Sequence, residues 1–237
     1  MTLRDHWLHE SGGLVWHWRA LRHRQSLWSP FCHTVAGWLD TWAAPRDKLL
    51  IIGPSAGYTL GADWLHSWGE VAACEPDPFA RWLLQRRMAR HIHFHRINVF
   101  APGGLRMLVQ AFPHHALLFS NVLGQCAPRD ATAARWYADL HAALRGHHWA
   151  SYHDVASSNR APDKAEPAPQ ADAASLESVL AQFWQGGELA ITDHGTFGLG
   201  LADPRKAESP LLERAFAVWR LRPDQHHLVE WLSHVPT

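Results

Sequence analysis

Cysteine is scarce in this sequence, and no excess of charge of either sign is present. The three cysteines, Cys32, Cys74 and Cys126, lie far apart and form no C-x-x-C pair. A disulfide framework is therefore not predicted, and the reduced cytosol is the environment that fits. The 22 basic residues balance the 22 acidic ones. Charge thus gives no support to binding of a nucleic acid or an anionic membrane.

Long apolar runs are also absent. No stretch approaches the roughly 20 apolar residues that a membrane-spanning helix needs, and no basic segment followed by an apolar one opens the sequence. We therefore expect a soluble, cytoplasmic protein. Its 237 residues can bury one substantial core. Tryptophan and histidine are abundant instead, with 14 and 19 residues, and tryptophan offers large, rigid packing area.

The stretch 48–77 carries the strongest pattern. The apolar run 49–52 is typical of a parallel strand that is buried on both faces, and it ends at Gly53. Small or turn-forming residues follow, and they predict a tight bend whose amides a ligand can approach. These residues are Gly53, Pro54, Ser55, Ala56 and Gly57. A helix over 58–68 is predicted next, with its N-terminus aimed at the bend.

A second apolar run, 71–74, ends at Glu75. This carboxylate comes about 20 residues after the bend, where dinucleotide-binding folds carry an acid that binds ribose. We interpret the whole stretch as a βαβ unit that holds a nucleoside.

Strand, Gly-x-Ser-x-Gly bend, helix, strand and Glu75-Pro76-Asp77 resemble the first half of a class I S-adenosylmethionine-dependent methyltransferase. The resemblance extends from about residue 45 to the C-terminus. Family members usually have an acid where this chain has Ile51 and a glycine where it has Ser55. The resemblance implies a Rossmann-like α/β fold: a mostly parallel seven-stranded sheet, helices on both faces and a C-terminal antiparallel hairpin. The alternating segments 214–221 and 226–235 independently predict that hairpin.

The cofactor implied by the resemblance is S-adenosylmethionine. The residues that it assigns to the cofactor are Gly53, Pro54, Ser55, Gly57, Glu75, Pro76, Asn98, Val99 and Ser120. Amides of the bend would approach the methionine and ribose, Glu75 would bond the ribose hydroxyls, and Asn98 would lie near the adenine. Asn98 also suits a turn before Pro102 without any ligand, and both alternatives stay open.

Three residues are candidates for catalysis or for orienting the acceptor: Asn121, His153 and His194. Asn121 follows the predicted strand 115–119, at the edge where ligands of open α/β sheets gather. Its segment is not of the Asn-Pro-Pro-Tyr type, which disfavours methylation of base amino groups. His153, near the end of the predicted strand 147–155, could accept a proton or be a structural histidine tied to Asp154 or to a backbone carbonyl. His194 belongs to the polar segment 193–198.

One domain is the simplest account, because no internal repeat or inter-domain linker is evident. Within it we expect an N-terminal helical cap over 1–44 and a methyltransferase-like domain over 45–237. The cap could cover the cofactor pocket, as in the resembling family, or simply cover the sheet edge. Residues 156–174 lack large apolar side chains and predict a mobile surface loop.

One strand face offers candidate metal ligands. His91, His93 and His95 alternate along a predicted strand and could bind zinc or nickel. No adjacent acid or cysteine completes the set, so no metal site is assigned.

The function predicted is that of an S-adenosylmethionine-dependent methyltransferase whose acceptor, a small molecule or a protein, is not identified. Nucleic acid and membrane partners are not expected, and the oligomeric state is not predicted. An inactive binding or scaffold protein with the same fold is the main alternative. A serine hydrolase with Ser55, Asp154 and His194 is a further one, because Gly53 to Gly57 also match a nucleophile elbow. That enzyme would need an earlier strand, ahead of 49–52, to supply its oxyanion-hole loop, whereas residues 1–47 are predicted to be helical. It would also give Glu75 no role.

Overall fold

The computed structural model describes residues 13–128, 130–169, 175–200 and 212–236. Within them, nine strands form one sheet in the order β3-β2-β1-β4-β5-β9-β8-β6, and β7 pairs with β5. The strands are β1 (Lys48–Ile52), β2 (Glu70–Cys74), β3 (His93–His95), β4 (Ala116–Ser120), β5 (Trp149–Ser158), β6 (Ala168–Pro169), β7 (Ile191–Asp193), β8 (Leu212–Arg222) and β9 (Gln225–His234).

The strand directions confirm the predicted fold class. β3, β2, β1, β4 and β5 run parallel to their neighbours, whereas β9 pairs antiparallel with both β5 and β8. Seven strands thus form the expected mostly parallel sheet with its antiparallel hairpin. The short β6 and β7 extend it beyond the prediction.

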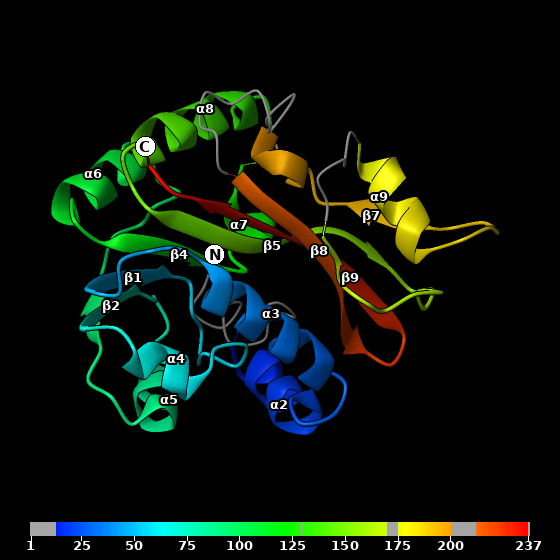
Figure 1. Ribbon diagram of the computed structural model, residues 1–237, viewed down its shortest axis with the longest axis horizontal. Coiled ribbons are helices and arrows are strands. Elements are labelled where there is room, and N and C mark those ends of the chain that lie inside the picture. The colour runs from blue at the N-terminus through cyan, green and yellow to red at the C-terminus, as the bar shows by residue number, and fades with distance from the viewer. Residues whose placement is uncertain (1–12, 129, 170–174, 201–211, 237) are drawn as a thin grey trace.

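Helices lie on both faces of this sheet, with α2 to α5 on one side and α6 and α8 on the other (Figure 1). The helices are α2 (Gly13–His23), α3 (Ser29–Thr41), α4 (Ala62–His66), α5 (Pro78–Met88), α6 (Gly104–Ala111), α7 (Leu123–Cys126), α8 (Ala133–Leu144), α9 (Leu176–Phe183) and the 3-10 helix η1 (Phe197–Gly200). None of these described helices is long and apolar enough to cross a membrane.

The apolar run of β1 is explained by burial on both faces. Successive side chains of a strand point to opposite sides, so Leu49 and Ile51 pack on the side of α3 and α4, whereas Leu50 and Ile52 pack on the side of α6 and α8. All four are almost completely buried. This central strand therefore joins two hydrophobic clusters and holds the bend that follows it.

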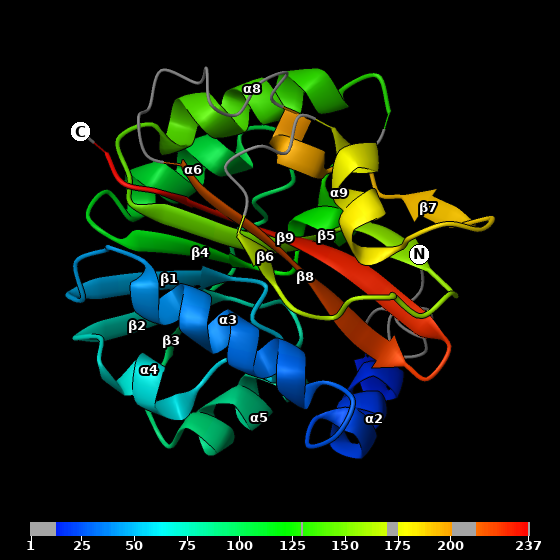
Figure 2. The ribbon, with the colours of Figure 1, turned by 45° about the vertical axis from the view of Figure 1, so that its right-hand side comes forward.

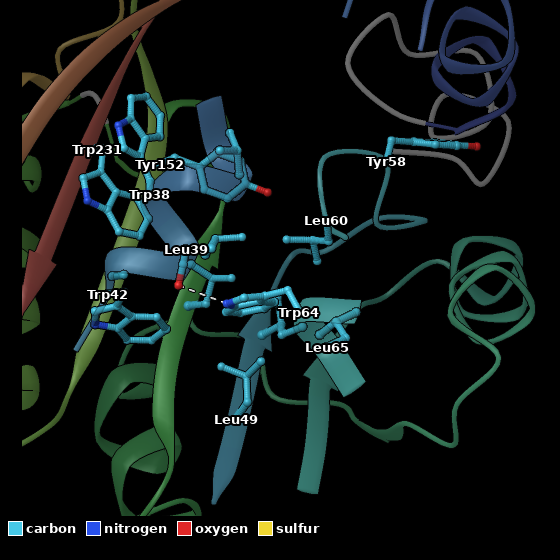
Figure 3. Packing of buried hydrophobic residues seen from close by; sticks show 14 of the residues in the cluster. Trp38, Leu39, Trp42, Leu49, Tyr58, Leu60, Trp64, Leu65, Tyr152 and Trp231 are labelled. Carbon is cyan, nitrogen blue, oxygen red and sulfur yellow. Dashed lines mark hydrogen bonds between the residues drawn. The ribbon is translucent and has the colours of Figure 1, made fainter. Parts of the chain in front are cut away.

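The helix α3 covers a sheet face, whereas the prediction placed the cap over the cofactor pocket or the sheet edge. Trp38 stacks on Trp231 of β9 with ring centroids 5.7 Å apart. The indole of Trp64 in α4 donates a hydrogen bond to the carbonyl of Leu39 at 3.0 Å, as Figure 3 shows. Cap and sheet therefore share one core. The first twelve residues of the predicted cap lie outside the described part of the chain.

Three predicted boundaries are wrong. The helix expected over 58–68 is reduced to the five residues of α4, because the chain makes successive turns up to Gly61. The edge strand expected to start at His91 begins at His93. The loop expected over 156–174 begins only after Ser158, since β5 extends to that residue, and residues 170–174 lie outside the described part.

Candidate functional site

The bend after β1 is built from three residues with left-handed backbone. Gly53, Ser55 and Gly57 have φ angles of 67°, 50° and 64°. A Cβ atom on Gly53 would lie 2.8 Å from the side chain of Val122, and one on Gly57 would lie 2.6 Å from Leu84 Cδ1. Glycine is therefore favoured at both ends of the bend, by its positive φ at both positions and also by the close approach of Val122 at Gly53. Ser55 adopts the left-handed region between them although it has a side chain, which costs free energy.

Glu75 points at this bend from the carboxyl end of β2. The amide of Ser55 donates to its Oε2 at 2.8 Å, and the amide of Asp77 donates to its Oε1 at 3.0 Å. Glu75 is 7% exposed. Burial raises its pKa, although the hydrogen bonds from Asp77 and Ser55 act in the opposite direction. Because a carboxylate oxygen has two lone pairs, each keeps one acceptor position for a further donor.

Asp77 and Pro76 complete the turn after β2. The Asp77 carboxylate accepts from the amide of Phe79 at 2.8 Å and so caps α5, whose first residue is Pro78. Pro76 is exposed beside Glu75. The turn therefore holds the Glu75 side chain through the amide of Asp77.

The helix α2 of the cap meets both ends of this site. His17 Nδ1 lies 2.7 Å from the hydroxyl of Tyr58, just after the bend, and its Nε2 lies 3.6 Å from an oxygen of Asp77. Burial lowers the pKa of His17, and Asp77 raises it in part. Tyr58 belongs to the hydrophobic cluster that Figure 3 shows. The cap thus contacts the segments on either side of the predicted cofactor site as well as covering the sheet.

Asn98 and Val99 have structural partners. The Asn98 side-chain oxygen accepts from the amide of Phe100 at 3.1 Å, which is the turn role that the sequence left open. Val99 is buried in the cluster on the side of α6 and α8. Pro54 at the bend is likewise buried. The structure therefore places Asn98 in a ligand-independent turn and gives no separate support to its adenine role.

A chain of buried hydroxyl groups joins the bend to the end of β4. The Tyr152 hydroxyl contacts Ser120 Oγ and lies 2.7 Å from Thr59 Oγ1. Burial raises the pKa of Tyr152 to about 12, so this hydroxyl stays protonated at neutral pH. The prediction included Ser120 but missed Thr59 and Tyr152. The pairing of Ser120 with Tyr152 in adjacent strands could have indicated one of these contacts.

The sequence analysis expected His153 near the end of its strand, but β5 continues beyond it to Ser158. His153 is fully buried within β5, with Nε2 3.3 Å from Glu230 Oε2 and Nδ1 3.0 Å from Ser151 Oγ. Glu230 also contacts Arg214 and accepts from the amide of Gly198 at 2.8 Å. The structural alternative for His153 therefore fits the geometry. Its Nε2 lies 3.3 Å from the carbonyl oxygen of Thr196, the kind of partner that the sequence analysis allowed for, and its acidic neighbour is Glu230 instead of Asp154.

Asn121 and Asp154 come together at the end of β4. Asn121 has a φ of 52°, and its side-chain oxygen accepts from the amide of Asp154 at 3.2 Å. An oxygen of Asp154 lies 3.2 Å from Nδ1 of His227, a residue that the sequence analysis did not single out. His194 lies nearby, with its ring centroid 5.8 Å from that of His227 and its Nε2 3.2 Å from Ser157 Oγ.

The three strand histidines do not form a metal-binding group. The rings of His91 and His93 meet edge to face at 4.5 Å, and His95 packs against Phe112. Across the described ranges, no group of three or more His, Cys, Asp or Glu side chains could hold a metal ion.

The nucleophile elbow lacks its helix. Such an elbow places the serine between a strand and a helix that starts directly after it, whereas α4 begins at Ala62, beyond the turns that follow Ser55. The amide of Ser55 is also engaged by Glu75. The bend geometry thus favours a ligand cradle over an elbow.

The sheet order, the hairpin and the bend facing an acid define a class: the chain has the fold of class I S-adenosylmethionine-dependent methyltransferases. A methyltransferase of that kind from Anabaena variabilis is similar to it over 99% of this chain and 96% of its own, with a TM-score of 0.51 and 10% identity. This likeness shows the fold.

Two further solved structures are similar over most of their length. The N-methyltransferase NodS from Bradyrhizobium japonicum has a TM-score of 0.45 and 12% identity, over 89% of this chain and 97% of its own. The magnesium protoporphyrin IX methyltransferase ChlM from Synechocystis, with bound S-adenosylhomocysteine, has a TM-score of 0.42 and 13% identity, over 89% of this chain and 82% of its own. No protein-family model matches the sequence, and neither does any curated protein.

Proposed function

We propose that this protein is an S-adenosylmethionine-dependent methyltransferase. The observation that carries the proposal is the contact between Glu75 and the amide of Ser55, at the carboxyl ends of two neighbouring parallel strands. Ligands of open α/β sheets bind at these ends, and an acid after the second strand is suited to ribose hydroxyls. The shielded carboxylate keeps two acceptor positions, which fits the two hydroxyl groups of an adenosine ribose.

The chain's own residues would bind and orient the reactants. Glu75 would accept hydrogen bonds from the ribose, the amides around the bend would approach the methionine portion, and Ser120 and Asn121 would border the methyl group. S-adenosylmethionine, when bound, supplies an electrophilic methyl group. Transfer of such a group depends largely on holding the reactants in line. The acceptor would be a small molecule or a protein, since the net charge is zero.

A binding or scaffold protein that has kept only the fold remains the second candidate. Ile51 favours it, because this fully buried residue of the core stands where family members usually carry an acid. Loss of that acid removes one polar contact near the cofactor. Binding of S-adenosylmethionine with no turnover on any acceptor would favour this candidate.

Calorimetric titration with S-adenosylhomocysteine tests the proposal. We expect the wild type to bind and Glu75→Ala to bind more weakly by about 1–3 kcal/mol, because hydrogen bonds to a charged group are lost. Glu70→Ala is the matched control. Glu70 lies at the other end of the same strand in an exposed pair with Lys48, so its removal should leave affinity unchanged. Absence of binding by the wild type would contradict both methyltransferase-based candidates.

A further inference from the structure

A buried acid and a buried histidine face each other beyond the end of β4. Asp154 of β5 is 4% exposed and His227 of β9 is 8% exposed. Asp154 Oδ2 lies 3.2 Å from His227 Nδ1. The irregularity in β5 between Asp154 and Ala156 changes the register with β9 at this point, and such a bulge redirects side chains.

The pair adjoins the segment where the methyl group is expected. β4 ends at Ser120, opposite Tyr152, whereas β5 continues to Ser158. Asp154 therefore lies past the carboxyl end of β4, and its amide is bonded to Asn121. A Cβ atom on Gly124 in α7 would lie 2.7 Å from the Asp154 carbonyl oxygen, so the segment after β4 packs directly on Asp154. Figure 2 shows β5 and β9 running side by side through this part of the sheet.

Neither ring nitrogen of His227 has a hydrogen-bond partner among the residues that the structure describes. Nδ1 has the ion-pair contact with Asp154, whereas Nε2 is buried with no polar contact to the described residues and is the nitrogen left for a ligand. An unpaired buried polar atom destabilises a protein, so it indicates a position where a ligand can bind. Burial acts to raise the pKa of Asp154, but His227 and His194 outweigh it, so the pKa is lowered and the carboxylate is ionised at neutral pH. A carboxylate at Nδ1 favours the tautomer whose proton is on that nitrogen.

We propose that His227 accepts the proton of a hydroxyl group on the methyl acceptor, with Asp154 as the residue that positions it. The inference rests on the proposed function and adds the acceptor class. The acceptor's O–H bond breaks, its proton bonds to His227 Nε2, and the oxygen keeps the electron pair with which it bonds the methyl carbon. The carbon–sulfur bond breaks with its electron pair remaining on sulfur. A neutral hydroxyl needs such a base, whereas a carboxylate or a thiolate does not.

Nitrogen-15 NMR of histidine-labelled protein tests the pair without any turnover. The signal missing from His227→Gln identifies the imidazole of interest. We expect its proton on Nδ1 in the wild type and on Nε2 in Asp154→Asn, because the introduced amide can donate to Nδ1. His226→Gln is the matched control, since alternation along β9 points His226 to the other face. A proton on Nε2 in the wild type, or no change in Asp154→Asn, would overturn the assignment.

The acceptor class is tested separately from the cofactor. Titration with S-adenosylhomocysteine should give equal affinity for wild type and His227→Gln; failure of the wild type to bind would reject the proposed function, and the tautomer result would stand on its own. With the product bound, phenol as the probe should shift the His227 Nε2 signal, and benzoate should not. No shift with phenol would overturn the hydroxyl assignment.

Discussion

Ser55 stands in the bend where members of the resembling family usually carry glycine. It adopts a φ of 50°, a region that glycine enters freely and other residues enter at a cost. We expect Ser55→Gly to raise the free energy of unfolding by about 1 kcal/mol, because relief of backbone strain exceeds the extra entropy of glycine in the unfolded chain. Urea denaturation measures the change.

The neighbouring residue provides the control for this substitution. Ala56 is buried and has no left-handed backbone, so Ala56→Gly should lower the free energy of unfolding by about 0.5–1 kcal/mol or more. The amide of residue 55 still reaches Glu75 in Ser55→Gly, and its affinity for S-adenosylhomocysteine should be preserved. Destabilisation by Ser55→Gly would show that the serine side chain stabilises the bend by more than its strain.

The proposed role of Glu75 predicts that affinity for S-adenosylhomocysteine depends on pH. The ionised carboxylate accepts more hydrogen bonds, so we expect affinity above the folded-state pKa of Glu75 and its loss as pH falls through that pKa. Burial raises that pKa. The loss should therefore begin at a higher pH than for an ordinary glutamate, whose pKa is about 4.3. Titrations of S-adenosylhomocysteine from neutral to acidic pH measure this effect.

The Glu75→Ala variant separates this effect from other titrating groups. It should lose the part of the pH dependence that belongs to Glu75, and an identical pH profile in both proteins would contradict the assignment. The contribution of Glu75 to folding stability changes with pH in the direction opposite to its contribution to affinity. Because the pKa is raised on folding, the stabilising contribution of Glu75 is complete below its unfolded value and is lost as pH rises through the folded one.

At the scale of the elements, one stacked pair of aromatic rings joins α3 to β9. Trp231 is 1% exposed and stacks on Trp38. We expect Trp231→Ala to lower the free energy of unfolding by about 3–5 kcal/mol, since a large buried ring leaves a cavity, with a smaller loss in Trp231→Phe. Denaturation in urea tests this.

The exposed tryptophan of α2 supplies the comparison. Trp18 is 61% exposed, so Trp18→Ala should change stability by no more than about 0.5 kcal/mol. Equal losses at Trp18 and Trp231 would contradict the packing of α3 on β9.

Apolar runs predicted the strands well because burial on both faces leaves little choice of residue, as in β1. The helix over 58–68 was wrong for a related reason. Leu60, Trp64 and Trp68 recur at helical spacing and are all buried, but Gly57 has left-handed backbone, and the turns after it bury Leu60 without a helix. Spacing alone could not separate these two ways of burying the same residues.

At the scale of the whole molecule, the sequence predicted only the part of the site that lies at the ends of neighbouring parallel strands. Glu75 and Ser55 meet because neighbouring parallel strands end at the same edge, which the order of motifs predicts. Asp154 and His227 meet only because β9 inserts between β5 and β8 and because β5 has an irregularity beside Asp154. Neither feature leaves a spacing signal in the sequence, so His227 could not be predicted.

The position of β9 also orders events during synthesis. This strand follows every other described strand in the chain, yet it fills the gap between β5 and β8. During synthesis, α3 and β1 to β5 leave the ribosome before β9. Trp38 can therefore stack on Trp231 only after β9 has been synthesised. The nascent polypeptide therefore holds an unfinished sheet edge and a bare aromatic surface until translation of the hairpin is complete, which is the interval when it would most need a chaperone.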